Sequence, residues 1–508
     1  MTVTFRRRVD NIILRWQGRL DGDGADRLAP YLVAGALFVV LLLLSVAQAR
    51  SLDGTPDLAA YTQAAWSIRH GFAPVATVTT GSNIFAAQGA AIFYPLAQAS
   101  RLVPSIPLLL TVQSAALAFA VVPLWRVCRR LANLRSGASL LVLLVYALYP
   151  IVQTLNLDGF RPETLALPFL IGAGYFGLTQ HWRRFAACCL IAMLCRADLG
   201  LAVAGLGVLV MVQGYRRRGG IAVGVGLVWA FGFLLIVQPH VGSEVSQLQA
   251  YAAYGSTPWS VLWGMLTNPL VVLNHVFSHE NFQLLVYLFA PVLFLPFLSP
   301  RYLLPVVPLQ LIYLAGDVAP ATRYGPQAVA ITAFIFMATP QGLSRLGRRN
   351  VEKVTLDRRF LITMTVAALS FFVLYGPSSP YSHPWAWGSQ DAADGARLDA
   401  RDGTDVDARV RASESMLTLM AERRILFRLE VGSGLGPAPD AEAAATDVDV
   451  IIIDRREFGA VGAVGAVDGL DGPVGPIDRA RERTFEASLT ALGFHLVADA
   501  QDIVVLRR

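Results

Sequence analysis

The sequence predicts an α-helical polytopic membrane protein with about eleven transmembrane helices, followed by a small extracytoplasmic α/β domain. Three observations support this fold class. Hydrophobic residues make up 55% of the 508 residues and charged residues only 15%, whereas soluble domains carry about 25% charged residues. Apolar runs of helical length repeat as far as residue 376, and each bilayer crossing needs about twenty such residues. Beyond Gly376 the composition becomes acidic, which predicts a separate domain.

Charge divides the chain into the same parts and sets its orientation. Residues 377–508 carry a net charge of −8, and residues 1–376 carry a net charge of +14. The positive residues lie in the basic segment 1–30 and mostly in short loops, a pattern that keeps such loops in the cytoplasm. The basic pI therefore indicates no nucleic-acid partner. We expect a cytoplasmic N-terminus over 1–30, a transmembrane domain over 31–376 and an extracytoplasmic tail over 377–508.

The predicted crossings alternate so that every basic cluster stays on the cytoplasmic side. One region is ambiguous, because Arg196-Ala197-Asp198 interrupts an apolar stretch. A single long helix would bury both charges and place one basic cluster outside, so two short helices are predicted there. The predicted crossings cover 31–49, 105–125, 137–154, 164–180, 185–195, 199–214, 220–238, 282–298, 302–316, 326–341 and 360–376.

Two longer segments, 50–104 and 239–281, lie on the outer side in this topology. In the first, apolar residues recur at helical spacing after Pro56, which predicts a helix lying along the membrane surface. Asp57 falls in its first turn, where the helix dipole favours a negative charge. The second segment contains tyrosine and tryptophan residues, which suit the membrane interface.

The acidic tail has the pattern of a small α/β domain. Val410–Leu429 and Arg479–Leu492 are predicted to be helices, and Val448–Asp454 and Ile503–Leu506 to be strands. The tail contains no catalytic motif. Interaction with a partner or stabilisation of the membrane domain is therefore its expected role.

Several short motifs together give the chain a resemblance to a known family. They are Asp57-Leu58 with Gln63-Ala64-Ala65-Trp66, Pro107 to Gln113, Tyr149-Pro150, Asp158 to Pro162, Asp198 to Leu201 and Leu298 to Tyr302, with Val450 to Asp454 and Gly493 to Val505 in the tail. The chain resembles the bacterial membrane proteins catalogued as domain of unknown function 2079, a family with no settled activity. Its architecture is similar to that of GT-C glycosyltransferases, whose large first outer loop carries an acidic catalytic residue and whose donors are polyprenyl-phosphate sugars.

The resemblance implies a GT-C-like fold in the bacterial plasma membrane, with membrane lipid, a polyprenyl-phosphate sugar and a glycan acceptor as partners. The chain departs from the family pattern at a few positions. Gln88 and Arg161 stand where histidines are typical, Thr62 stands in place of an acid, and Arg196-Ala197 replaces a Lys-Glu pair. A role that depends on histidine is therefore not transferred to this chain.

Asp57 is the candidate catalytic residue, as the carboxylate that accepts the proton of an acceptor hydroxyl. Its alternative role is to stabilise the helix N-terminus. Asp53, four residues earlier in an Asp-Gly pair, is the second choice and is better explained as a turn residue.

Arg161, Arg196 and Arg69 are the candidates for binding the donor phosphate, because arginine binds phosphate bidentately and keeps its charge when partly buried. The topology brings Arg161 and Arg196 to the same side of the membrane as Asp57. The supporting acids are Asp158, Glu163 and Asp198. The alternative is structural ion pairing, Arg161 with Asp158 or Glu163 and Arg196 with Asp198, and for Arg69 an exposed position at the lipid headgroups.

The residue spacing supports neither a metal site nor a cofactor. Three functions of different class follow. The first is an inverting glycosyltransferase that uses a lipid-linked sugar on the outer face for cell-envelope glycan assembly. The second is a transporter or flippase of an envelope lipid or glycan, and the third is a non-enzymatic membrane scaffold. Only the first requires a carboxylate above an apolar groove.

Overall fold

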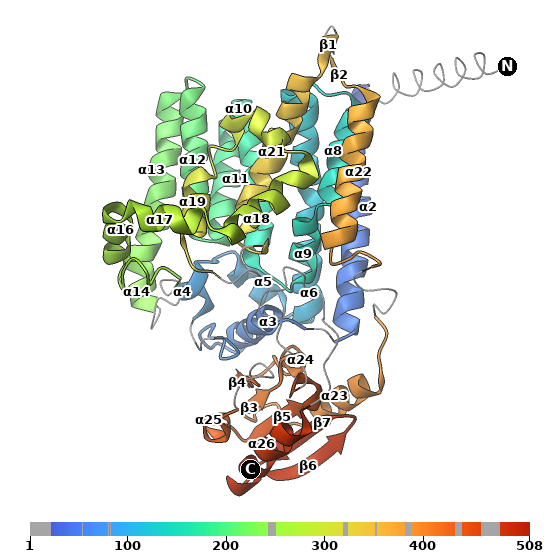
Figure 1. Ribbon diagram of the computed structural model, residues 1–508, viewed down its shortest axis with the longest axis vertical. Coiled ribbons are helices and arrows are strands. Elements are labelled where there is room, and N and C mark those ends of the chain that lie inside the picture. Colours follow the sequence, from blue (N-terminus) through green and yellow to red (C-terminus); the bar gives the residue numbers. More distant parts are fainter. Residues whose placement is uncertain are drawn as a thin grey trace, which may run out of the picture.

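The computed structural model describes residues 22–52, 54–79, 81, 83–241, 250–318, 324–350, 353–381, 388–431, 439–458 and 478–508. Figure 1 shows a bundle of roughly parallel helices with the C-terminal domain attached at one end. The start of α2 (Asp23–Arg50) and the β1–β2 hairpin (Arg348–Asn350 and Lys353–Thr355) lie at the opposite end of the bundle.

The bundle is built from ten principal helical segments in the described part of the chain. Their helices are α2 (Asp23–Arg50), α6 (Ser105–Phe119) continuing through α7 (Val121–Arg126) and the π-turn η1 (Val127–Leu131), α8 (Ser136–Ala147), α9 (Pro150–Leu157), α10 (Ala166–Leu178), α11 (Trp182–Cys195), α12 (Leu199–Val212), α13 (Arg216–Gly232), α21 (Ala328–Leu346) and α22 (Arg358–Tyr375). The predicted pair of short helices around Arg196 is confirmed as α11 and α12.

By length and composition, four helices in the described residues can each cross a membrane. They cover Asp26–Arg50, Ser105–Leu131, Arg216–Val241 and Arg358–Tyr375. The bent pair of α8 and α9 makes a fifth if it counts as one span, with a bend of 46°. The bend falls at Pro150, which has no N–H to continue the helical hydrogen bonds. These four or five helices of the described residues are fewer than the roughly eleven crossings that the sequence predicts.

The predicted continuous crossings at 282–298 and 302–316 are wrong. Instead, the chain forms α18 (His279–Phe289), three short 3₁₀ segments η4 (Ala290–Val292), η5 (Leu295–Leu298) and η6 (Pro300–Tyr302), and α19 (Val307–Ala315). The prolines at 291, 296 and 300 remove backbone donors from this apolar stretch. Leu293 and Phe294 also adopt left-handed backbone angles, which end the helix.

Between α2 and α6, the first outer segment forms α3 (Pro56–Arg69), α4 (Ile84–Gln88) and α5 (Phe93–Ala99). The predicted helix at Pro56 is confirmed, but it does not lie exposed on the membrane surface. Almost every residue of α3 from Leu58 to Ile68 is buried, because the helix lies between the bundle and the C-terminal domain (Figure 1).

The second outer segment lies across the helices of the bundle in Figure 1. Its described part contains α14 (Gln238–Val241), α16 (Pro258–Thr267) and α17 (Pro269–Val276), while residues 242–249 lie outside the described residues. Trp259 and Trp263 are 67% and 69% exposed, and residues 250–278 include no Asp, Glu, Lys or Arg. The interfacial position of this segment remains a prediction.

The C-terminal domain contains a five-stranded mixed sheet in the order β4-β3-β5-β7-β6. Its elements are α23 (Ala392–Asp402), β3 (Val410–Ala412), α24 (Glu414–Leu417), β4 (Leu426–Arg428), α25 (Ala441–Ala445), β5 (Val450–Asp454), the 3₁₀ turn η7 (Arg455–Phe458), α26 (Arg479–Ala491), β6 (His495–Ala500) and β7 (Ile503–Arg507). The predicted helix Val410–Leu429 is therefore wrong, because parallel pairing of β3 with β4 and β5 buries Val410 and Leu426 in a sheet. The other three predicted tail elements are confirmed.

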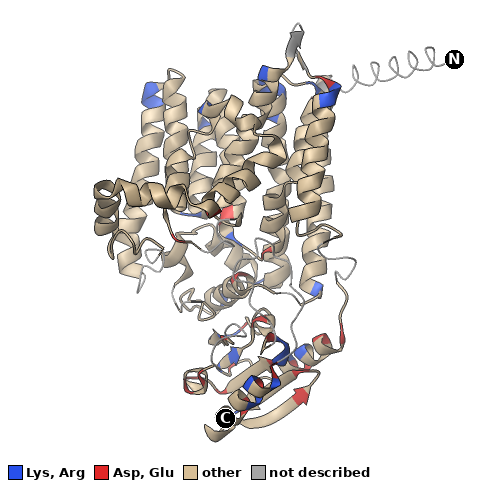
Figure 2. Ribbon diagram, viewed as in Figure 1, with Lys and Arg blue, Asp and Glu red and all other residues tan. Residues whose placement is uncertain are grey.

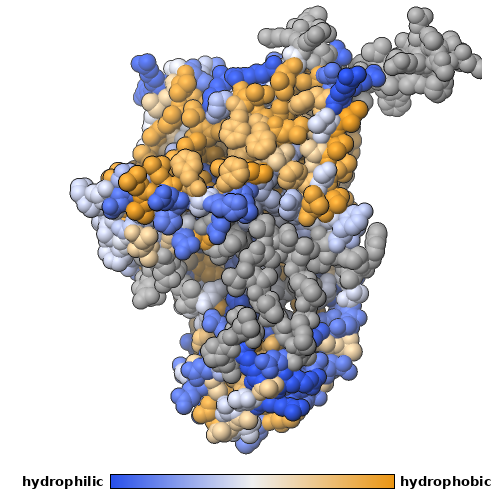
Figure 3. Space-filling view, in the orientation of Figure 1, coloured by the Kyte–Doolittle hydropathy of each residue, from blue (hydrophilic) through white to orange (hydrophobic). Residues whose placement is uncertain are grey.

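Charge and hydropathy follow the long axis of the molecule. Lysine and arginine gather at the end of the bundle farthest from the C-terminal domain, as Figure 2 shows. A hydrophobic surface covers the bundle between its two ends, while the C-terminal domain is largely hydrophilic (Figure 3). This distribution agrees with the predicted orientation of the chain, with basic residues on the cytoplasmic side.

Candidate functional site

Asp57 lies where the sequence predicts it, in the first turn of α3. Thr55 is the N-cap residue, and its hydroxyl accepts a hydrogen bond from the backbone N–H of Leu58 at 3.3 Å. Pro56 occupies the first helical position, where its missing N–H costs nothing. The Asp57 side chain is 37% exposed, so an external group can reach it.

Arg161 joins Asp57 to a second carboxylate. Its Nη2 atom lies 2.5 Å from Asp57 Oδ2 and 2.8 Å from Asp158 Oδ2, while the arginine side chain is only 15% exposed. Burial raises the pKa of the Asp158 carboxyl to about 6, and the charge of Asp57 adds to this effect while Arg161 opposes it. Two carboxylates therefore share one guanidinium group at the start of α3.

The loop that carries Asp158 and Arg161 is held from the bundle side by Gln113 of α6. The Gln113 amide donates hydrogen bonds to the carbonyls of Leu155 and Gly159, and its oxygen accepts the backbone N–H of Arg161 at 2.9 Å. Gly159 has a φ of +74°, and a Cβ there would fall 2.1 Å from Thr55 Oγ1. Only glycine allows the loop to approach the N-cap of α3 this closely.

A second ion cluster is centred on Arg196, in the turn between α11 and α12. Its Nε lies 3.0 Å from Asp198 Oδ2, and its Nη1 lies 3.4 Å from Glu163 Oε1. Tyr313 of α19 donates a 2.6 Å hydrogen bond to Asp198. The guanidinium carbon of Arg196 also lies 5.8 Å from the centre of the Tyr313 ring. The side chains of Arg196 and Glu163 are 10% and 2% exposed.

Glu163 connects the two clusters electrostatically. Burial raises the pKa of the Glu163 carboxyl, and the charges of Arg196 and Arg161 both oppose that shift. Tyr61 of α3 interacts electrostatically with both arginines. Its hydroxyl donates a 2.8 Å hydrogen bond to the side-chain oxygen of Gln88. The predicted site residues Asp57, Asp158, Arg161, Glu163, Arg196 and Asp198 thus form one charged region.

Several buried polar atoms in this region lack a hydrogen-bond partner among the described residues. They are Arg161 Nε, Glu163 Oε2, Thr164 Oγ1 and Asp198 Oδ1. An unpaired buried polar group costs about 1–3 kcal/mol, and native proteins usually pair such groups with water or ligand. The region can therefore form further hydrogen bonds with a bound polar molecule.

Arg69 does not belong to this region. It lies at the other end of α3, where its side chain pairs with Glu422 of the C-terminal domain at 3.1 Å and donates to the carbonyl of Ser100 at 3.2 Å. Its side chain is 18% exposed. In the described residues, Arg69 therefore connects α3 to the C-terminal domain and to the chain after α5. The second-choice acid, Asp53, lies outside the described residues.

Two apolar spaces lie near the site. A small pocket of about 60 Å³ lies between α2, α6, the start of α3 and the C-terminal domain, and Thr55, Leu58, Gly159 and Thr418 are among its lining residues. Neither Arg161 nor Arg196 lines it. A larger apolar groove of about 200 Å³ lies between α18, η5, α19 and α21. Gln310 is a lining residue of this groove, one helical turn before Tyr313, and its side-chain oxygen has no partner among the described residues.

One protein family, described as predicted membrane protein DUF2079, matches residues 49–462. The chain belongs to this family. The match covers most of the chain, including every candidate site residue discussed above. Among curated proteins, no match by sequence is found.

In structure, this DUF2079 protein is similar to ArnT from Cupriavidus metallidurans bound to undecaprenyl phosphate. The TM-score is 0.52 at 12% sequence identity, over 93% of this chain and 97% of that chain. It is also similar to the apo form of the Archaeoglobus fulgidus oligosaccharyltransferase, with a TM-score of 0.44 at 13% identity, over 83% of this chain and 70% of that chain. The similarity to ArnT shows a GT-C-like fold, as the resemblance implied.

Sequence reasoning missed three residues that organise the site of this DUF2079 protein. Gln113 and Tyr61 lie within or beside the quoted motifs, so the motifs alone could have drawn attention to them. Tyr313 gives no such signal, because its bond to Asp198 joins residues 115 positions apart. Among the described residues, no group of three or more His, Cys, Asp and Glu side chains could hold a metal ion.

Proposed function

We propose that this protein is an inverting membrane glycosyltransferase that takes its sugar from a polyprenyl phosphate for cell-envelope glycan assembly. The observation that carries the proposal is the convergence of Asp57 with two arginines at one end of an ArnT-like membrane fold. In this proposal the protein lies in the bacterial plasma membrane, with its N-terminus in the cytoplasm and its C-terminal domain outside.

The proposed reaction is a single displacement at the anomeric carbon of the donor sugar. The acceptor hydroxyl oxygen forms the new bond to that carbon, while the bond from the carbon to the phosphate oxygen breaks. The polyprenyl phosphate leaves with the bonding electron pair, and the acceptor proton passes to the carboxylate of Asp57. Arg161 and Arg196 stabilise the negative charge that develops on the leaving phosphate.

The geometry supports these roles in two ways. Asp57 is exposed enough to meet an acceptor, whereas the side chains of Arg161 and Arg196 are only 15% and 10% exposed. Partial burial strengthens their interaction with an anion. The apolar groove beside α19 offers space for a polyprenyl chain, and α19 extends from this groove to the Arg196 cluster through Tyr313. Asp158, Glu163 and Asp198 hold the two arginines in place until the phosphate binds.

The test is Asp57→Asn in the purified full-length protein in liposomes. Radiolabelled undecaprenyl-phosphate hexoses serve as donors and a bacterial envelope extract as the acceptor source, and release of undecaprenyl phosphate is measured. Loss of a general base slows such reactions about 10²–10⁴-fold. Glu422→Gln is the matched control, because it changes a carboxylate at the same domain junction that contacts Arg69 rather than Asp57. Full turnover of Asp57→Asn, with a normal melting temperature, would exclude the assigned role.

A further inference from the structure

The sheet of the C-terminal domain has a reversal in strand order that the proposed function does not use. The parallel strands β3, β4 and β5 are arranged with β3 in the middle. From β3 the chain passes to β4 on one side, and from β4 it crosses to β5 on the other. Helix α24 packs in the core on one face and α25 in the core on the other. In such sheets, ligands bind outside the carboxyl ends of the two strands where the direction reverses.

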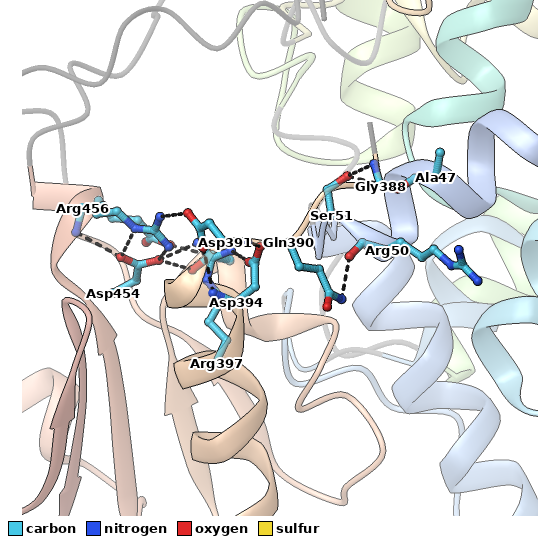
Figure 4. Close-up of polar contacts among 12 residues, drawn as sticks. Ala47, Arg50, Ser51, Gly388, Gln390, Asp391, Asp394, Arg397, Asp454 and Arg456 are labelled. Carbon is cyan, nitrogen blue, oxygen red and sulfur yellow. Dashed lines mark hydrogen bonds and ion pairs between the residues drawn. The ribbon is translucent and has the colours of Figure 1, made fainter. Parts of the chain in front are cut away.

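Polar side chains gather at that position. Asp454 ends β5 and is 1% exposed. Its carboxylate accepts hydrogen bonds from Arg397 at 2.7 Å, from Ser415 at 3.0 Å and from Arg456 at 3.2 Å. Figure 4 shows Asp454, Arg397 and Arg456 turned toward one another, with Asp391 beside Arg456.

One buried donor of this cluster is unused. Arg397 is nine-tenths buried, and its Nε atom has no hydrogen-bond partner among the described residues. Its two terminal nitrogens bond Asp394 at 2.9 Å and Asp454 at 2.7 Å. The outer part of the cluster is accessible, because the side chains of Arg456 and Asp391 are 30% and 62% exposed.

The balance of charge in the cluster indicates the class of ligand. Three carboxylates, those of Asp391, Asp394 and Asp454, contact the guanidinium groups of Arg397 and Arg456. This excess of negative charge would repel an anionic ligand. The backbone N–H groups of Glu414 and Ser415, which could otherwise bind an anion, already donate to the Glu457 carboxylate. A sugar hydroxyl both donates and accepts hydrogen bonds, so neighbouring hydroxyls suit adjacent carboxylate and guanidinium groups.

This edge of the sheet faces the membrane domain. Thr418, just after α24, donates a 3.5 Å hydrogen bond to the carbonyl of Thr55, two residues before Asp57. On the other side of the cluster, Gln390 donates to the carbonyl of Arg50 at 3.1 Å, and the N–H of Gly388 bonds Ser51 at 3.3 Å (Figure 4). The polar edge therefore lies at the same domain junction as the start of α3.

We infer that the carboxyl edge of β3 and β5 is a second binding site, which holds the hydroxyl groups of a neutral glycan acceptor through Arg456 and Asp391. This inference rests on the proposed function, since it assigns the acceptor of the same reaction. Binding at this edge holds the glycan beside the first outer segment, from which its growing end reaches Asp57. The glycan site is separate from the region that holds the donor phosphate.

The test measures glycan binding without turnover. The full-length protein in detergent is applied to an array of immobilised neutral and acidic oligosaccharides, as wild type, Arg456→Gln and Asp391→Asn. Asparagine keeps the N-cap of α23, so the second variant preserves the fold. The loss of a hydrogen bond to a charged group is expected to weaken binding to neutral oligosaccharides about tenfold.

The matched control is Arg409→Gln, because Arg409 pairs with Asp449 at 2.8 Å at the opposite end of the same two strands. Arg409→Gln should bind like the wild type. The inference is overturned if Arg456→Gln and Arg409→Gln bind equally, or if the wild type binds only acidic oligosaccharides or none. Asp57→Asn separates the two proposals, because it should lose transfer and still bind the array.

Discussion

The contact between Gly159 and Thr55 is the point at which the assembly of the site can be tested most directly. Replacing Gly159 by alanine places a Cβ 2.1 Å from Thr55 Oγ1 and 3.2 Å from the backbone nitrogen of Leu58, on a backbone with a φ of +74°. The left-handed backbone costs a residue with a side chain about 1–2 kcal/mol. Displacing the N-cap hydroxyl of Thr55 costs about 0.5–2 kcal/mol more.

Gly71→Ala provides a matched reference for this prediction. Gly71 has a φ of +79°, and a Cβ added there meets nothing within 4 Å. It therefore reports the backbone cost alone, whereas Gly159→Ala adds the collision with α3. We expect Gly159→Ala to lower the free energy of unfolding by roughly 1 kcal/mol more than Gly71→Ala does.

The assay is thermal unfolding of both variants in one detergent, together with Thr55→Ala and the double variant Gly159→Ala/Thr55→Ala. Thr55→Ala removes the atom that collides, so the double variant should be about 1 kcal/mol more stable than the sum of the single effects predicts. Equal melting temperatures for Gly159→Ala and Gly71→Ala would refute the packing of the 158–161 loop against α3. Additive single effects would refute it as well.

Three further predictions follow from other parts of the structure. Arg196→Gln should lower the free energy of unfolding by about 3–5 kcal/mol, because it leaves the buried Glu163 and the partly buried Asp198 without their cation. Adding Glu163→Gln should restore part of the melting temperature. Burial raises the pKa of Asp454, but hydrogen bonds from Arg397 and Arg456 outweigh burial and hold this pKa below its ordinary value of 3.8. Its contribution to stability is therefore present above pH 4 and is lost as the pH falls through the lowered pKa, so the melting temperature of wild type should fall more steeply than that of Asp454→Asn below pH 4. Gln310→Met should leave the melting temperature unchanged or raise it, because the Gln310 side-chain oxygen has no hydrogen-bond partner among the described residues.

Local signals in the sequence predicted the elements that local chemistry determines. Pro56 and Asp57 mark the start of α3 because the first helical turn favours proline and a negative charge. The interruption at Arg196 predicted two short helices because charges are costly within a membrane helix. Both predictions are confirmed by α3, α11 and α12.

The elements that were wrongly predicted depend on contacts between distant residues. The apolar composition of 282–298 is that of a membrane helix, but Pro291 and Pro296 break it into short turns that pack against α21. The spacing in 410–429 resembles a helix, but strand pairing with β5, about forty residues later, decides its structure. Pairings of that kind leave no periodic signal in one segment.

The candidate site was predicted as a set of residues but not as an arrangement. The sequence placed Asp57, Arg161 and Arg196 on one side of the membrane, and the structure joins Asp57 to Arg161 directly. It could not place Arg69, whose partner Glu422 lies 353 residues away in the other domain. Because the contacts of α3 with the C-terminal domain join residues so far apart in the sequence, α3 was expected on the membrane surface rather than between the two domains.

The burial of α3 changes how the role of the C-terminal domain can be tested. Deleting 377–508 would separate a scaffold from an enzyme if the two domains folded independently. However, Ala59 and Val78 of the first outer segment belong to the same hydrophobic cluster as Met416 and Leu417 of the C-terminal domain. Gln63 of α3 donates hydrogen bonds to the carbonyls of residues 423 and 424 as well. Deletion would therefore expose the buried face of α3 and displace Asp57, so lost activity would be expected for an enzyme and a scaffold alike. Asp57→Asn distinguishes these functions instead, because it removes the proposed base and leaves that shared core intact.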